Sequence, residues 1–178
     1  MALVIERVIS TVSRCCLQNQ KEVDAIVPLA RHLQDENIPY RIITPYDAQR
    51  SALENALRDE DINWHDKCFN VDSFQGQYPL PQNAPVVAHI INTREQTGNE
   101  DHFIIISVVR SKELGFLKST CRSNVMLTRC QRGMYIVSSR AFLEGKGADS
   151  LVGKMATELG SRPGAWLTQK DLEEGKFE

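Results

Sequence analysis

Three short segments of this chain carry residue types that suit phosphate and nucleic-acid chemistry. They are residues 44–49 (Thr-Pro-Tyr-Asp-Ala-Gln), residues 71–76 (Val-Asp-Ser-Phe-Gln-Gly) and residues 122–129 (Arg-Ser-Asn-Val-Met-Leu-Thr-Arg). A threonine hydroxyl can bond a phosphate oxygen, and an aromatic ring can pack against a sugar or a base. Glycine lets the backbone turn closely beside a ligand, and the planar guanidinium of arginine presents fixed donors to phosphate oxygens. The residue types therefore make phosphate chemistry the first hypothesis.

The elements that must position these segments indicate an α/β fold. The run Phe-Ile-Ile-Ile-Ser-Val-Val at residues 103–109 shows little alternation, which is typical of a strand buried on both faces of a parallel sheet. Buried strands alternate with helical patterns, so we expect a sheet with helices on both faces and ligands at the carboxyl ends of its strands. We expect strands at residues 40–44, 68–71, 103–109 and 134–137, and helices at residues 22–33, 45–57, 122–130 and 149–159.

Composition narrows the class of protein. The chain has 178 residues, of which 42% are hydrophobic and 25% are charged, and this suits one globular domain. The formal net charge of −2 gives no overall attraction to nucleic acid, so binding must come from local groups. The five cysteines form no C-x-x-C pair, and we expect reduced thiols in a cytoplasmic or nuclear protein rather than zinc or disulfides. No apolar run is long enough to cross a membrane.

In their order along the chain, the three segments resemble motifs IV, V and VI of the superfamily 1 nucleic-acid helicases. The branch that includes the nonsense-mediated-decay RNA helicase is the most similar, and it shares the pattern Asn19-x-x-Glu22. The resemblance implies the C-terminal RecA-like half of such a helicase, which is a three-layer α/β domain of P-loop NTPase type with a mostly parallel sheet. It divides the chain into an unassigned extension at residues 1–12, the domain at residues 13–160 and a polar tail at residues 161–178.

The resemblance assigns the nucleotide side of a site. Arg129 follows the Leu-Thr pair of motif VI, where the family has its arginine finger, and such a cation is worth roughly 10³–10⁵ in rate. Gln75 and Gly76 match the Gln-Gly element beside the nucleotide, and Glu100 matches a ribose contact. Arg132, one turn after Arg129, would reach toward phosphate. The alternative for both arginines is a solvated side chain.

The resemblance also assigns a path for single-stranded RNA or DNA. Thr44 and Tyr46 match positions where the family's second domain meets the backbone of the strand. The alternative is that Thr-Pro-Tyr only caps a helix and fills the edge of the sheet. Asp72 and Ser73 would orient the strand-binding turn, and a simple Asx-type turn is the alternative. The family often has a second phosphate-binding arginine that corresponds to Gln20 of this chain.

Residues 77–98 interrupt motif V. In the family a glutamate follows two positions after the glycine, but Gly76 is followed here by Gln-Tyr. Joining Gly76 to Asn99 would restore the pattern Q-G-N-E-D-H-F-I-I-I-S and would bring Glu100 to the matching position. The segment is then an insertion, either a short intron translated in frame or a genuine surface insertion.

The sequence lacks the half of an ATP site that cradles the phosphates. No G-x-x-x-x-G-K-[ST] motif is present, and the nearest imitation, from Gly147 to Lys154, has the wrong spacing and no hydroxyl after the lysine. The acidic run at residues 59–61 indicates solvated surface rather than a magnesium ligand. We expect ATP with magnesium to bind only when a first RecA-like domain completes the site. The alternatives are a catalytically inactive binding or scaffold module and a truncated helicase fragment, so enzymatic activity of the chain alone stays open.

Overall fold

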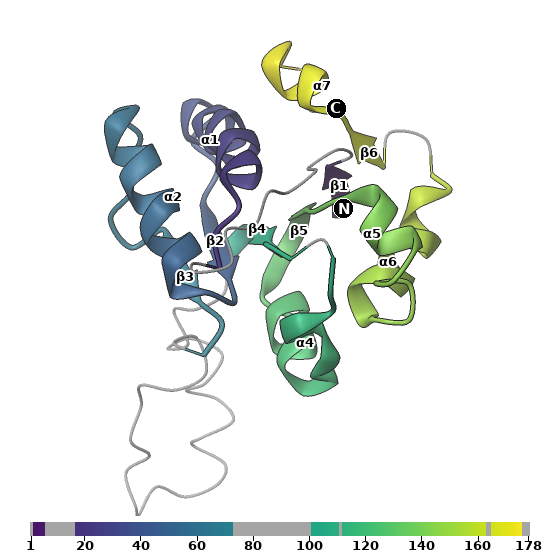
Figure 1. Cartoon of the computed structure of the whole chain (residues 1–178). Helices are drawn as coiled ribbons and strands as arrows, with labels where there is room; N and C mark the ends of the chain where they lie inside the picture. Colours follow the sequence, from purple (N-terminus) through teal and green to yellow (C-terminus); the bar gives the residue numbers. More distant parts are fainter. Residues whose placement is uncertain (1, 6–16, 73–100, 111, 163–164, 176–178) are drawn as a thin grey trace, which may run out of the picture.

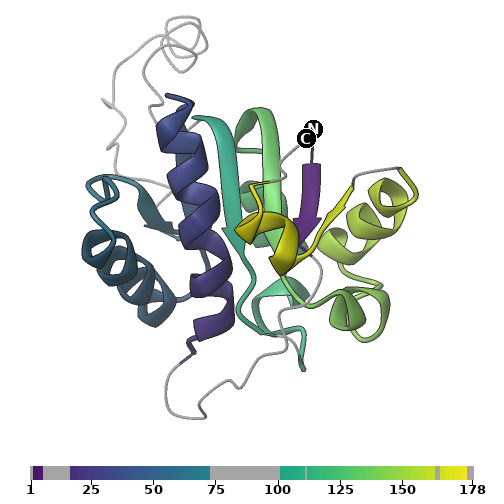
Figure 2. The same cartoon turned by 90° about the horizontal axis from the view of Figure 1, so that it is seen from above.

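The computed structural model describes residues 2–5, 17–72, 101–110, 112–162 and 165–175. In these residues one sheet separates two layers of helices (Figures 1 and 2), so the predicted three-layer α/β class is confirmed. The site residues Ser73, Gln75, Gly76 and Glu100 and the insertion at residues 77–98 lie outside the described residues.

Six strands form the sheet: β1 (Ala2–Ile5), β2 (Tyr40–Thr44), β3 (Cys68–Asn70), β4 (Asp101–Ser107), β5 (Cys130–Val137) and β6 (Trp166–Leu167). Their order is β3-β2-β4-β5-β1-β6, and the described pairings are all parallel. Parallel neighbours need a crossover between them, and helices on the faces of the sheet supply such crossovers.

Two groups of helices cover the two faces of the sheet (Figure 2). On one face lie α1 (Gln20–Asp35), α2 (Asp47–Asp59) and α7 (Gln169–Glu173). On the other lie the 3-10 helix η2 (Gly115–Lys118), α4 (Thr120–Leu127), α5 (Arg140–Glu144) and α6 (Leu151–Gly160). Successive side chains of a strand point to opposite faces, so Ile105 of β4 packs with α1 while Ile104 and Ile106 pack with the second group.

The predicted elements are present, but several of their ends differ. The second helix begins at Asp47, two residues after Pro45, and its buried side carries Gln49, Leu53 and Leu57. Residues four apart lie on the same face of a helix, so these three face the sheet together. The helix expected at residues 122–130 ends at Leu127, because its last predicted residue already belongs to β5 and pairs with β4.

Segments near both ends of the chain contribute to the sheet and its core. β1 lies between β5 and β6 in the sheet, and Leu167 and Leu172 are buried in the core beneath α1. Strands this short have a weak sequence pattern, and pairing with neighbouring strands gives them their order. Thr168 caps α7: its hydroxyl accepts a hydrogen bond from Asp171 N–H at 3.2 Å, and the Asp171 carboxylate accepts one from Thr168 N–H at 2.8 Å.

Candidate functional site

The described residues among those assigned from the sequence separate to opposite ends of the sheet. Thr44 is the last residue of β2, and Asp72 follows β3, so both lie at the carboxyl ends of strands. Arg129 precedes β5, whose first residue, Cys130, pairs with Asp101 at the start of β4. Arg129 therefore lies at the amino ends of the two central strands. The expectation that the informative residues gather at the carboxyl ends is wrong, because the chain has returned to the amino ends before β5 begins.

Arg129 occupies the short connection between α4 and β5. Thr128 ends the helix, since its hydroxyl and its backbone N–H both donate to the carbonyl of Asn124 at 3.0 Å. Arg129 is half-buried, and Arg132 is exposed on β5. Arg132 therefore does not follow one helical turn after Arg129. The end of α4 and the pairing of β5 with β4 together fix the backbone on both sides of Arg129.

Thr44 does not present its hydroxyl at the surface. The residue is 0% exposed, and its Oγ1 has no hydrogen-bond partner within the described part of the chain. Its carbonyl accepts a hydrogen bond from Val71 N–H at 3.1 Å, which continues the pairing of β2 with β3. In this conformation Thr44 supports the edge of the sheet, and its contact with a phosphate stays a prediction.

Tyr46 is held against the segment that leads into η2. Its hydroxyl accepts a hydrogen bond from Phe116 N–H at 3.3 Å, and the guanidinium of Arg110 lies over its ring, 5.8 Å from the centroid. Gly115, at φ +47°, passes so close that a Cβ there would lie 2.8 Å from the Tyr46 hydroxyl. Tyr46 is half-buried, so part of the ring remains at the surface.

Asp72 meets α4 across the carboxyl ends of the strands. Its carboxylate lies 3.5 Å from Nε of Arg122, and both side chains are about half exposed. Arg122 also lies over the ring of Phe116, 5.8 Å from the centroid. An Asx-type turn is present, but Asn70 makes it: the Asn70 side chain accepts a hydrogen bond from Asp72 N–H at 3.0 Å.

These contacts join into one surface, the arginine–aromatic cluster, made of Tyr46, Arg110, Phe116, Arg122 and Asp72. The sequence assigned a role to the tyrosine and the aspartate only. Arg122 is the first residue of the motif VI segment, and Arg110 directly follows the predicted strand at residues 103–109. Those two positions were the available signals, and no local pattern marks the phenylalanine.

A buried carboxylate lies beneath this end of the sheet. Glu22, in the first turn of α1, is 1% exposed. Its two oxygens accept hydrogen bonds from Val109 N–H at 3.0 and 2.9 Å, from the Ser107 hydroxyl at 2.6 Å and from the Asn19 amide at 3.1 Å. Burial raises the pKa of Glu22 to about 7, although these hydrogen bonds act to lower it.

Gln49 of α2 closes the network around this carboxylate. Its amide nitrogen donates to Ser107 Oγ at 3.1 Å and to the Asn19 carbonyl at 3.2 Å, while its oxygen accepts from Asn19 N–H at 2.7 Å. The network therefore ties α1, α2 and β4 together where the strands end. The Asn19-x-x-Glu22 pattern is visible in the sequence, but the partners on α2 and β4 are far away along the chain.

Comparison with known proteins identifies the family. A family model described as an AAA domain matches residues 6–141. The chain belongs to this family.

Relatives of this AAA domain are helicases. A putative ATP-dependent RNA helicase of Saccharomyces cerevisiae is 30% identical over 148 residues, covering 71% of this chain and 13% of that protein. The DNA polymerase alpha-associated DNA helicase A of the same yeast is 30% identical over 135 residues, covering 72% and 16%. The regulator of nonsense transcripts 1 homologue of Neurospora crassa is 33% identical over 102 residues, covering 55% and 8%. The resemblance to superfamily 1 helicases is thus confirmed, and the chain spans 8–16% of these relatives' length.

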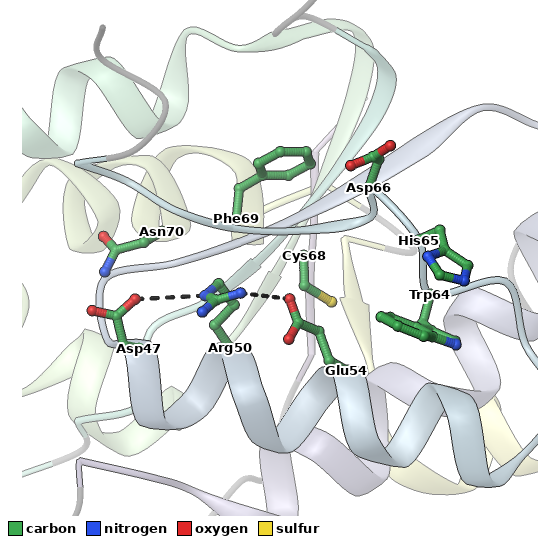
Figure 3. A pocket seen from close by; sticks show the side chains of 9 residues that line it. All are labelled: Asp47, Arg50, Glu54, Trp64, His65, Asp66, Cys68, Phe69 and Asn70. Carbon is green, nitrogen blue, oxygen red and sulfur yellow. Dashed lines mark hydrogen bonds and ion pairs between the residues drawn. The ribbon is translucent and has the colours of Figure 1, made fainter. Parts of the chain in front are cut away.

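A pocket of about 350 Å³ lies between α2 and β3 of the AAA domain (Figure 3). Among the described residues, none of the site residues assigned from the sequence lines it. Arg50 crosses it between Asp47 and Glu54, at 3.5 and 2.6 Å, and Asp66 adds a further carboxylate. The carboxylates outnumber the arginine, so the charge of this pocket disfavours a phosphate ligand.

The described part of the AAA domain shows neither a metal-binding cluster nor a helix that could cross a membrane. Its His, Cys, Asp and Glu side chains form no group of three or more that could hold a metal ion. No helix within the described ranges is both long enough and apolar enough to span a membrane. The acidic run at residues 59–61 is exposed, as predicted, and Glu60 pairs with Arg31 at 2.6 Å.

Proposed function

We propose that this chain is the C-terminal RecA-like half of an ATP-dependent helicase. It would supply Arg129 to ATP held by a first RecA-like domain, and the carboxyl ends of its β-strands would bind a single strand of RNA or DNA. The observation that supports this most directly is the division of the assigned residues between the two ends of one sheet. A nucleotide bound at one end of the sheet and a nucleic-acid strand bound at the other can be coupled through the sheet between them.

The nucleotide side is proposed at the amino ends of β4 and β5. Backbone fixed on both sides of Arg129 suits a finger that must enter a cleft at a set position. Gln75, Gly76 and Glu100 are proposed to approach the ribose and phosphates from motif V, with Arg132 nearby. ATP, bound with magnesium on the first domain, supplies the phosphoanhydride that is cleaved, and the guanidinium stabilises the charge that develops on its terminal phosphate.

The strand side is proposed at the arginine–aromatic cluster. Residues 110–122 hold four basic side chains and one acidic side chain, whereas the whole chain has a net charge of −2. Arginines contact phosphates, and aromatic rings stack on bases without regard to their sequence. In this proposal Tyr46 and Phe116 offer the ring faces, Arg110 and Arg122 contact the phosphates, and Asp72 with Ser73 orients the turn beside them.

A nucleic-acid-binding module without turnover is the second candidate. The segment from Gly147 to Lys154, which most nearly imitates a phosphate loop, is the cap of α6. Ser150 Oγ accepts from Gly153 N–H at 3.1 Å and donates to the Gly147 carbonyl at 2.6 Å. These groups serve the helix itself, so the chain alone offers no phosphate cradle there.

Joining the chain to the first RecA-like domain of a helicase from the same family separates the two candidates. The helicase half predicts that the fused protein hydrolyses ATP faster when a single strand is added, while the first domain alone does not respond. RNA and DNA oligonucleotides of equal sequence would show which strand is preferred. A fused protein that binds ATP and strand but hydrolyses no faster than the first domain would favour the binding module.

A further inference from the structure

The backbone at the end of β4 adopts a rare turn. Arg110 N–H donates to the Val108 carbonyl at 2.8 Å, and Val109 between them has φ +69°. This is the strained form of the three-residue γ-turn. For a β-branched residue a positive φ is an outlier that persists only when surrounding structure holds it. Something must therefore fix Val109.

We propose that Glu22 is a positioning residue for the strand-binding face: its carboxylate fixes the turn at Val109 and thereby directs Arg110 over Tyr46. The proposal rests on the proposed function, because it takes the strand to run across the arginine–aromatic cluster. It assigns to the Asn19-x-x-Glu22 pattern a role at the strand side rather than at the nucleotide side.

The geometry of the carboxylate supports this role. Val109 N–H points at both oxygens of Glu22, at 3.0 and 2.9 Å, and so is held at the point where φ turns positive. The Ser107 hydroxyl donates to one of the same oxygens at 2.6 Å. An ionised carboxylate accepts all of these bonds, whereas a protonated one must use one oxygen as a donor. Protonation therefore weakens the hold on the turn.

The turn sets the direction of Arg110. Arg110 directly follows the turn, and its guanidinium extends over the Tyr46 ring and pairs with Glu113 at 3.1 Å. The Tyr46 hydroxyl in turn holds Phe116 N–H. A change of backbone conformation at Val109 would move Arg110 and loosen the segment that carries Phe116.

Within the described residues, the groups that hydrogen-bond Glu22 are neutral ones. Asn19 faces it from α1, Ser107 and Val109 face it from β4, and Gln49 of α2 braces Asn19 and Ser107. None of these titrates near neutral pH. Burial raises the pKa of Glu22 to about 7, so the hold on Val109 should change between pH 6 and pH 8.

The test uses the full chain, a fluorescent single-stranded oligonucleotide and the variants Glu22→Gln and Glu54→Gln. Glu54 is the matched control, because it is a helical glutamate paired with Arg50 at 2.6 Å, outside the arginine–aromatic cluster. We expect Glu22→Gln to bind about fivefold more weakly at pH 8, and Glu54→Gln to bind like the wild type. From pH 8 to pH 6 the affinity of the wild type, divided by that of Glu22→Gln, should fall about threefold. The two proteins share all other titratable groups, so the ratio cancels their effect on binding.

A second readout keeps the proposal testable whether or not a strand binds. The amide resonance of Val109 should titrate with a midpoint near pH 7 in the wild type and should not titrate in Glu22→Gln. In Ser107→Ala the midpoint should rise, since the serine hydroxyl lowers the pKa of Glu22. A Val109 amide resonance that does not change with pH in the wild type overturns the positioning role of Glu22. Equal strand affinity of Glu22→Gln and wild type at pH 8 also overturns it. A titrating amide in a chain that binds no strand leaves the turn in place and contradicts the proposed function instead.

Discussion

Replacing Glu22 by glutamine should change how the stability of this domain depends on pH. The pKa of Glu22 is raised from 4.5 to about 7 in the folded chain because the carboxyl is fully buried. Between these values the unfolded chain has released the proton and the folded chain still holds it. The contribution of Glu22 to the free energy of unfolding therefore falls as pH rises through the window, and this contribution is greatest below pH 4.5.

The size of the effect follows from the pKa difference. Each pKa unit corresponds to about 1.4 kcal/mol, so the ionised Glu22 costs the fold about 3 kcal/mol above pH 7. Glutamine has nearly the same shape and no charge, so it removes this cost. Large pKa increases also occur at Tyr40 and Cys68, whose pKa values are raised to about 12. These two groups stay protonated between pH 4.5 and pH 8.

Urea unfolding followed by circular dichroism at pH 5 and pH 8 measures the difference. The unfolding free energy of Glu22→Gln minus that of the wild type should increase by about 2–3 kcal/mol between the two pH values. Taking the difference cancels the histidines and surface carboxylates, which both proteins share. Parallel pH dependence of the two proteins would refute the reasoning, because it would mean that Glu22 titrates alike in the folded and unfolded chains.

Two further predictions concern the face and the tail of the domain. Arg122→Ala should weaken binding to a single strand of nucleic acid and reduce the slope of log affinity against log salt by about one. The control is Arg31→Ala, which removes a similarly exposed and ion-paired arginine of α1 and should leave affinity and slope unchanged. Equal losses in the two variants would show that the nucleic acid does not bind at the arginine–aromatic cluster. Thr168→Ala should lower the unfolding free energy by about 1 kcal/mol because it removes the cap of α7, and a melting temperature equal to the wild type would show that the tail does not stabilise the domain.

The sequence predicted features that depend on neighbours along the chain. The apolar run of β4 identified a strand buried on both faces. The ordered motifs indicated the helicase family, which the AAA-domain match at residues 6–141 and the similarity to helicases together confirm. Each of these signals lies within one short segment, so no knowledge of packing was needed.

Features that depend on packing were missed. Glu22 shows no special environment in the sequence, because its partners on α2 and β4 meet it only in the folded sheet. The placement of Arg129 at the amino ends follows from where α4 stops and β5 begins, and strand pairing decides that boundary. Thr44 was assigned from its motif, but its burial is set by the neighbouring strand.

The most direct test of the central claim is the effect of Arg129→Ala on ATP hydrolysis when the chain is joined to a first RecA-like domain. At saturating ATP and strand, an arginine finger predicts that kcat falls by roughly 10³–10⁵-fold, while the affinity for the strand stays at the wild-type value. A kcat within tenfold of wild type would contradict the claim that this chain completes an ATP site.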